Sequence, residues 1–229
     1  MNQKIKNFIS IFIFGSLLGF SQQDTGNWLM YFGTNKISEK LSIHSEVQYR
    51  NYTISPTNIE QLLLRTGLNY HFKSNASTTI GYAHIGNHVY KSDRKSPEIE
   101  EHRIWQQLLT TNNIGRVKFE HRYRFEERFI EKDFKMRFRY RLMLFFPINR
   151  PKIETGTIYL GVYDEIFVND KRNFFDRNRL YGGIGYQYAD NLHFQVGILR
   201  QETQTESKTF LQFGMILNTN LITDKKKDL

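Results

Sequence analysis

Histidine and serine side chains that could act together in hydrolysis lie close to one another in the stretch HIGNHVYKSDRKS, residues 84–96. A histidine within hydrogen-bond distance of a serine can take up the hydroxyl proton and make the oxygen a nucleophile. His84 and His88 precede Ser92 and Ser96 at the point where a predicted strand passes into a long loop. The stretch supports the hypothesis of a lipase or acyltransferase, although the same residue types are common in polar loops without any catalytic role.

Other groupings of reactive residues give no support to a metal site, an acid–base pair or a phosphate-binding loop. His84 and His88 share one face of a predicted strand, but four residues along a strand span about 13 Å, so we expect no metal site and no cofactor. Adjacent carboxylates such as Glu126 and Glu127 point to opposite faces and make poor acid–base pairs. The glycine-rich YGGIG, residues 181–185, is followed by no helix, as a phosphate loop would be. We expect its glycines to make room for bulky neighbours.

Arginine and glutamate alternate with aromatic residues in FEHRYRFEERF, residues 119–129, and again in the segment that follows. A period of two places the two rows on opposite faces of a strand. Arginine forks pair well with carboxylates on neighbouring strands. The polar rows of all such segments give the candidate site, a charge network of Glu46, Arg50, Arg65, Glu120, Arg122, Arg124, Glu126, Arg137, Arg139, Arg141, Glu165 and Arg179.

Composition limits the class of protein. The chain has 229 residues, of which 39% are hydrophobic, enough for one domain with a core. It has no cysteine, which excludes disulfides and thiolate metal sites. The formal net charge is +9, but lysine and arginine are spread along the chain and often alternate with apolar residues. This distribution is typical of charged strand faces, and we expect no nucleic-acid partner.

The first residues have the three parts of a secretory signal. Lys4 and Lys6 precede an apolar run over residues 8–20, and Gly19 and Ser21 are small residues suited to cleavage before Gln22. A membrane-spanning helix needs about 20 apolar residues, more than this run provides. The sequence therefore predicts a cleavable signal peptide over residues 1–21 and a single barrel domain over residues 22–229.

Alternation recurs from residue 41 to residue 221, whereas helical periodicity is almost absent. Tight polar connections such as SNAS, NNIG and ADN alternate with long ones, as in a meander of hairpins. We count ten full strands and one shorter apolar segment, NWLMYFG, at residues 27–33. Because bacterial barrels normally have an even number of strands, we expect Trp28 to Gly33 to form a short added strand, a plug, or half of a twelve-stranded arrangement.

Strand length indicates the surroundings of the apolar rows. Strands of globular proteins cluster around 5–6 residues, whereas these segments run to about 12–15. A strand of about 13 residues, tilted near 45°, rises roughly 30 Å, which matches the hydrocarbon core of a bilayer. The apolar rows would overfill a small soluble barrel but can face lipid. The sequence therefore predicts an all-β, up-and-down antiparallel transmembrane β-barrel of about 10–12 strands in the outer membrane.

Several features in order resemble one known family of small bacterial barrels. They are EVQYR (46–50), LLLRTGLNY (62–70), GYAH (81–84), EHRIWQQ (101–107), FEHRYRFEERF (119–129), RFRYRLMLFFP (137–147), YDEIF (163–167) and FDRNRLYGGIGY (175–186). Together they are similar to domain of unknown function 2490, a family common in Bacteroidota, over roughly residues 27–220. The resemblance implies an outer-membrane barrel and implies no particular activity.

These observations lead to one functional hypothesis and two alternatives. The hypothesis is a non-enzymatic protein with a structural, binding or envelope-maintenance role, whose interior is filled by the arginine–glutamate network. Its expected partners are outer-membrane lipid and, during biogenesis, the barrel-assembly machinery, and its ligand is left open. The alternatives are a lipid-modifying enzyme and a narrow pore that favours anions, because arginines outnumber glutamates in the candidate network.

Overall fold

The structure is a computed structural model that describes residues 25–90, 96–170 and 174–222. The proposed signal peptide lies outside these residues. No helix within them is long and apolar enough to cross a membrane. The described residues form the strands β1 (Thr25–Lys36), β2 (Leu41–Asn51), β3 (Ile59–Lys73), β4 (Ala76–Asn87), β5 (Ile99–Ile114), β6 (Val117–Ile130), β7 (Asp133–Pro147), β8 (Ile158–Asn169), β9 (Phe175–Ala189), β10 (Leu192–Thr203) and β11 (Ser207–Asn220).

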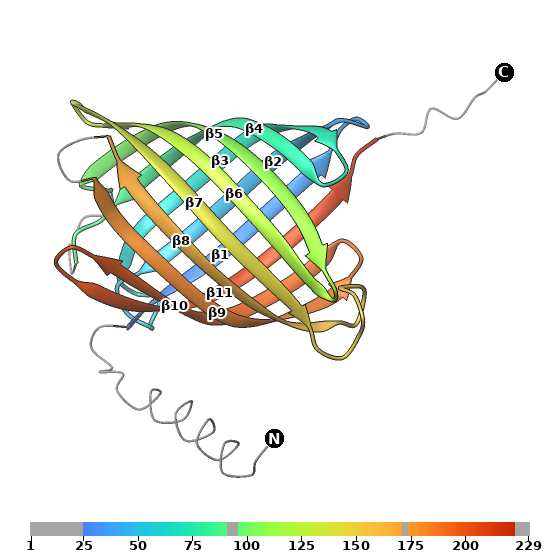
Figure 1. Cartoon of the computed structure of the whole chain (residues 1–229). Coiled ribbons are helices and arrows are strands. Elements are labelled where there is room, and N and C mark those ends of the chain that lie inside the picture. Colours follow the sequence, from blue (N-terminus) through green and yellow to red (C-terminus); the bar gives the residue numbers. More distant parts are fainter. Residues whose placement is uncertain (1–24, 91–95, 171–173, 223–229) are drawn as a thin grey trace, which may run out of the picture.

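These eleven strands form one closed barrel, in which each strand pairs antiparallel with the next along the chain (Figure 1). The barrel closes between β1 and β11, which run parallel in a register from Thr25↔Thr209 to Lys36↔Asn220. Closure gives every strand two neighbours and leaves no open sheet edge. The prediction of an all-β up-and-down barrel of about 10–12 strands is confirmed.

The expectation that Trp28 to Gly33 forms a short added strand, a plug or half of a twelve-stranded arrangement is wrong. β1 has 12 residues, comparable to its neighbours, and pairs along its length with both β2 and β11. Its boundaries were hard to read because both rows of the segment are apolar, with Trp28 and Met30 on one face and Leu29 and Tyr31 on the other. Since the strand number is odd, β1 begins at the opposite end of the barrel from the end of β11 (Figure 1).

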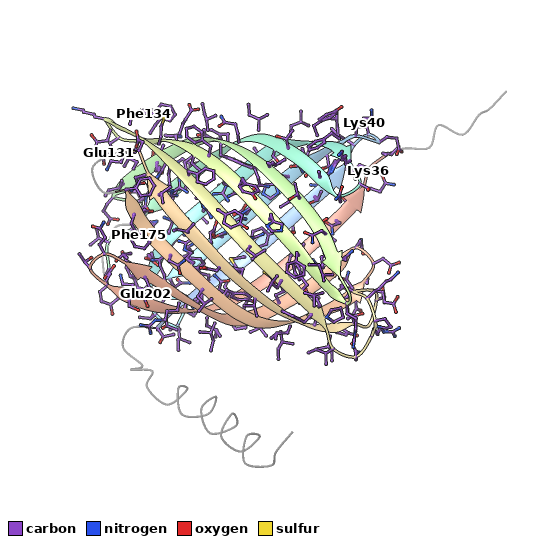
Figure 2. All side chains as sticks on the ribbon, in the orientation of Figure 1. Lys36, Lys40, Glu131, Phe134, Phe175 and Glu202 are labelled. Atoms are coloured by element: carbon purple, nitrogen blue, oxygen red, sulfur yellow. The ribbon has the colours of Figure 1, made fainter. Side chains whose placement is uncertain are left out.

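We call the end of the barrel where β11 finishes the C-terminal rim, and the opposite end the N-terminal rim. Figure 2 marks Lys36 and Lys40 at the C-terminal rim, and Glu131, Phe175 and Glu202 at the N-terminal rim. The C-terminal rim carries the short connections 37–40, 74–75, 115–116 and 190–191, and one longer connection, 148–157. The N-terminal rim carries the connections 52–58, 88–98 and 170–174, and two short ones, 131–132 and 204–206.

The two faces of the barrel wall differ in chemistry. Phe138 and Arg139 are neighbours on β7. Phe138 points outward and is 41% exposed, whereas Arg139 points inward and is 6% exposed. Every strand carries at least one large apolar residue on the exposed outer face. Examples, one from each strand in order, are Leu29, Ile43, Leu64, Ile80, Ile104, Tyr123, Phe138, Ile166, Ile184, Val196 and Phe213.

The interior is mixed and contains aromatic residues as well as charges. One buried cluster centres on Trp105, and a second contains Trp28, Tyr181 and Phe210. Glycines leave space for some of the buried aromatic rings. A Cβ atom at Gly185 would overlap the ring of Tyr159, and one at Gly183 would overlap the hydroxyl of Tyr181. These two glycines of YGGIG therefore make room for bulky neighbours, as predicted.

Candidate functional site

The inner face of β6 and β7 carries arginine or glutamate at successive alternate positions. The two strands pair so that Glu126 lies opposite Arg137, and Arg124 lies opposite Arg139. Strand alternation turns these side chains inward and turns the intervening aromatic residues, such as Phe125, outward. The local pattern of β6 and β7 thus positions the centre of the candidate charge network.

Glu126 is the centre of this network and has no exposed surface. Its Oε2 accepts hydrogen bonds from Nη2 and Nε of Arg137 at 2.6 and 3.0 Å, and its Oε1 accepts one from Nη1 of Arg139 at 2.7 Å. Guanidinium nitrogens of Arg65 and Arg103 lie 3.7 and 3.8 Å from the same carboxylate. One carboxylate on β6 therefore contacts arginines from β3, β5 and β7 across the barrel.

Two of these arginines extend the network to further carboxylates. Arg139 also donates hydrogen bonds of 2.7 and 3.0 Å to Glu165, which accepts another from Arg122 at 2.7 Å. Arg65 donates hydrogen bonds of 2.7 and 2.8 Å to the two oxygens of Glu46. The result is a continuous alternation of charge across the interior, in the order Glu46, Arg65, Glu126, Arg139, Glu165 and Arg122.

Not every predicted residue joins this chain. Glu120 and Arg141 form a separate ion pair at 2.5 Å. Arg50, Arg124 and Arg179 have no carboxylate within ion-pair distance in the described part of the chain, and bind glutamine side chains instead. The guanidinium carbons of Arg50 and Arg179 also lie 3.9 and 4.7 Å from the ring centre of Trp28, as in cation–π contacts. The interior therefore contains more buried cations than buried anions.

Three charged residues of the interior, Glu101, Arg103 and Asp176, were not predicted from the sequence. Nε of Arg103 and Nε of Arg128 lie 2.6 and 2.5 Å from Glu101, and Arg137 also pairs with Asp176 at 3.1 Å. Glu101 and Arg103 were missed because their segment was ambiguous in facing. Its register with β6, which places Arg103 opposite Arg128, resolves the ambiguity.

Water has little access to the middle of the barrel. Arg139, Glu165 and Glu126 are 6%, 3% and 0% exposed. Residues that line an open water channel would be in contact with water and therefore more exposed. Burying an ion pair costs several kcal/mol per ion in desolvation, and this cost is recovered only when geometry and hydrogen bonding are good. The repeated bidentate and shared contacts meet this requirement, so the network can fill and rigidify the barrel interior.

A sequence model of the family described as Protein of unknown function (DUF2490) matches residues 25–212, from the start of β1 into β11. The chain belongs to the DUF2490 family. No curated protein and no solved structure gave a significant match. Because the family description names no activity, the function of this DUF2490 protein must be argued from its own geometry.

The histidine–serine stretch that suggested an enzyme does not form a dyad in the described residues of the DUF2490 protein. Ser92 lies outside them. The ring of His84 lies beside Glu100 and His102 on the outer wall, and no hydrogen bond joins it to Ser96. The described part of this loop therefore gives no support to the hydrolase hypothesis.

A different serine–histidine pair lies at the C-terminal rim of the DUF2490 barrel. Ser42 Oγ is 2.8 Å from His71 Nε2 and accepts a hydrogen bond of 2.9 Å from Asn69. Both residues border a hollow of about 410 Å³, together with Asp190 and Asn218. Ser42 is only 1% exposed, and in the described chain no carboxylate lies within ion-pair distance of His71. The pair has the contact that nucleophile activation needs, but no hydrogen bond from a further described residue orients the ring of His71.

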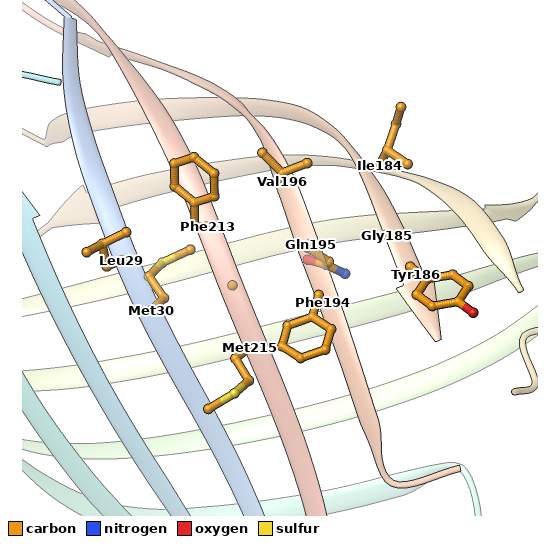
Figure 3. Close-up of a pocket in the computed structure, with 11 residues that line it drawn as sticks. Leu29, Met30, Ile184, Gly185, Tyr186, Phe194, Gln195, Val196, Phe213 and Met215 are labelled. Atoms are coloured by element: carbon orange, nitrogen blue, oxygen red, sulfur yellow. The ribbon is translucent and has the colours of Figure 1, made fainter. Parts of the chain in front are cut away.

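The outer wall of the DUF2490 barrel contains a second hollow, of about 550 Å³, over β1, β11, β10 and β9 (Figure 3). Phe213, Val196 and Leu29 border it, and its lining also includes Gly185 and Gly214. Gln195 is the only residue of its lining with a side-chain amide, and the lining includes no charged residue. The hollow is continuous with the apolar outer surface and offers no catalytic group.

Proposed function

We propose that this DUF2490 protein is a transmembrane barrel of the outer membrane with a non-enzymatic structural, binding or envelope-maintenance role. Its interior is closed by the arginine–glutamate network rather than kept open for transport. Outer-membrane lipid surrounds the wall, and the barrel-assembly machinery is the partner that we expect during insertion.

The distribution of apolar residues between the two faces carries this proposal. Large apolar side chains are exposed on all eleven strands, while the charged side chains of the centre are buried inside. A soluble barrel needs the reverse arrangement, since exposed apolar patches larger than a few hundred Å² are rare on soluble monomers. Lipid also demands that every backbone group be paired, and a closed barrel satisfies this demand.

Fractionation and conductance measurements test the two parts of this proposal. The full-length protein, expressed in a Gram-negative host, should enter the outer-membrane fraction and resist extraction by carbonate. Reconstituted in planar bilayers, it should give no steady conductance. Recovery in the soluble periplasmic fraction would contradict the membrane location. Steady anion-selective conductance would support the pore alternative, to which Arg50, Arg124 and Arg179, cations without a carboxylate partner among the described residues, would contribute.

A lipid-modifying enzyme is the second candidate, and the contact between Ser42 and His71 favours it. If this pair is catalytic, the purified barrel should react with a fluorophosphonate probe, and both Ser42→Ala and His71→Gln should abolish the reaction. Ser45→Ala on the same strand is the matched control. Absence of labelling in the wild-type protein would leave the non-enzymatic role as the account of this site.

A further inference from the structure

Two histidines and a glutamate meet on the outer wall near the N-terminal rim. His84 on β4 lies directly opposite His102 on β5 in the antiparallel register. Glu100 is two residues from His102 on the same strand, so the two side chains share the outer face. One metal-ligating atom from each of the three residues lies within 4.8 Å of the other two. The pairing of β4 with β5 thus brings three possible ligand side chains together.

The contacts within this cluster suit a metal ion. His84 Nε2 is 3.9 Å from Glu100 Oε2, and the ring centres of His84 and His102 are 5.1 Å apart. The 3.9 Å gap exceeds an ordinary hydrogen-bond distance, and among the described residues no hydrogen bond joins the side chains of the three groups to one another. An ion between them would need each ligand atom at about 2.0–2.2 Å, a distance that small side-chain rotations can give.

A fourth residue already orients one of the candidate ligands. The hydroxyl of Tyr82, also on β4, hydrogen-bonds Nδ1 of His102. This contact leaves Nε2 of His102 without a hydrogen bond to any described residue. Histidines that bind metals generally use their second ring nitrogen in such a hydrogen bond, which fixes the orientation and tautomer of the ring. Tyr82 and His102 therefore have the relationship of a supporting residue and a metal ligand.

We propose that His84, Glu100 and His102 bind one divalent transition-metal ion of the zinc type, with water completing the coordination. Two imidazoles and one carboxylate favour zinc and its transition-metal neighbours over calcium or magnesium, which prefer all-oxygen sites. The glutamate and His102 are exposed and His84 is partly exposed, so an ion can reach them from the aqueous side of the rim. The site is independent of the barrel's proposed role.

This proposal departs from the expectation that the chain has no metal site. That expectation considered His84 and His88, which are too far apart along one strand. In the structure the partner of His84 is His102 on the next strand and not His88. The pairing of β4 with β5 places His102 directly opposite His84. A bound ion would cross-link β4 and β5 just before the connection 88–98 that joins them.

Calorimetric titration of the untagged full-length protein with Zn²⁺, in detergent micelles, tests the site. The wild type should bind one ion per chain, and His84→Gln and His102→Gln should each remove this saturable binding. Tyr82→Phe should weaken it by about 10- to 100-fold, the cost typical of losing a supporting hydrogen bond. Co²⁺ in place of Zn²⁺ should give the visible absorption of a low-coordinate site in the wild type and not in His84→Gln or His102→Gln.

His121→Gln is the matched control. His121 also lies on the outer wall and hydrogen-bonds a tyrosine hydroxyl, that of Tyr140, at 2.9 Å, but it does not belong to the ligand cluster. Its substitution should leave Zn²⁺ binding unchanged. Absence of saturable binding by the folded wild type up to about 1 mM Zn²⁺ would overturn the proposal. Binding that survives in both His84→Gln and His102→Gln, shown by circular dichroism to be folded, would also overturn it.

Discussion

Arg139 donates a hydrogen bond of 2.7 Å to Glu126, although the residue opposite Glu126 in the strand register is Arg137. The contact is diagonal, and it lets Arg139 reach Glu165 on the far side at the same time. Glu126 in turn holds Arg137 and lies near two further arginines. Glu126 therefore lies close to four arginines, whereas Arg139 contacts two glutamates.

Replacing Glu126 should destabilise the barrel more than replacing Arg139. Glu126→Gln adds to an excess of buried cations and should lower the free energy of unfolding by about 3–5 kcal/mol. Arg139→Gln leaves Glu126 with Arg137 and leaves Glu165 with Arg122, so its cost should be smaller. Reversible urea unfolding from lipid vesicles measures both. An Arg139→Gln variant less stable than Glu126→Gln would contradict the description of Glu126 as the centre.

The cost of Arg139→Gln should depend on pH. At neutral pH the substitution leaves two buried carboxylates with one fewer cation each, and the charged forms of Glu126 and Glu165 are disfavoured. Protonation at acid pH relieves this cost in the variant. The difference in unfolding free energy between the two proteins should therefore shrink as the pH falls. A difference that is equal at neutral and acid pH would show that Arg139 contributes packing rather than charge.

Phe138 tests the opposite face of the same strand. If its side chain meets lipid near the midplane, Phe138→Lys should destabilise the inserted barrel by about 2–4 kcal/mol. Phe138→Leu keeps an apolar surface and should change the unfolding free energy by much less. The same vesicle unfolding experiment compares the two variants. Equal stability of the lysine and leucine variants would place Phe138 in contact with water.

Single cysteines can establish the orientation of the barrel, because the chain contains none of its own. Short turns of bacterial barrels face the periplasm and longer loops face outward, so the C-terminal rim should be periplasmic. In intact cells, Pro56→Cys in the connection 52–58 should react with a membrane-impermeant maleimide. Ser74→Cys in the turn 74–75 should react only after the outer membrane is permeabilised. The reverse labelling pattern would invert the proposed orientation.

Strand alternation made the wall of β6 and β7 predictable. Over residues 119–129 and 134–141 one row is mostly apolar and the other is charged, so facing could be assigned at Arg139 and Phe138 without a structure. β5 could not be assigned in this way, because both of its rows mix polar and apolar residues, such as Glu101 and Trp105 on one and His102 and Ile104 on the other. Only pairing with the neighbouring strands determines which row faces inward.

Contacts between side chains on different strands could not be predicted from the sequence. Arg65 on β3 approaches Glu126 on β6 because the barrel is narrow and both side chains are long, and no spacing along the chain indicates this contact. The cluster of His84 with His102 depends in the same way on the register of β4 with β5. The pair of Ser42 with His71 likewise requires the packing of β2 against β3.

Folding of the wild-type chain with and without lipid tests the central claim most directly. Residues 22–229 would be unfolded in urea and diluted into plain buffer or into buffer that contains lipid vesicles, and far-ultraviolet circular dichroism would then be recorded. Because the apolar outer wall needs lipid, we predict a β-rich spectrum with cooperative thermal unfolding only in the presence of vesicles. The same spectrum and the same cooperative transition in plain buffer would contradict a transmembrane barrel.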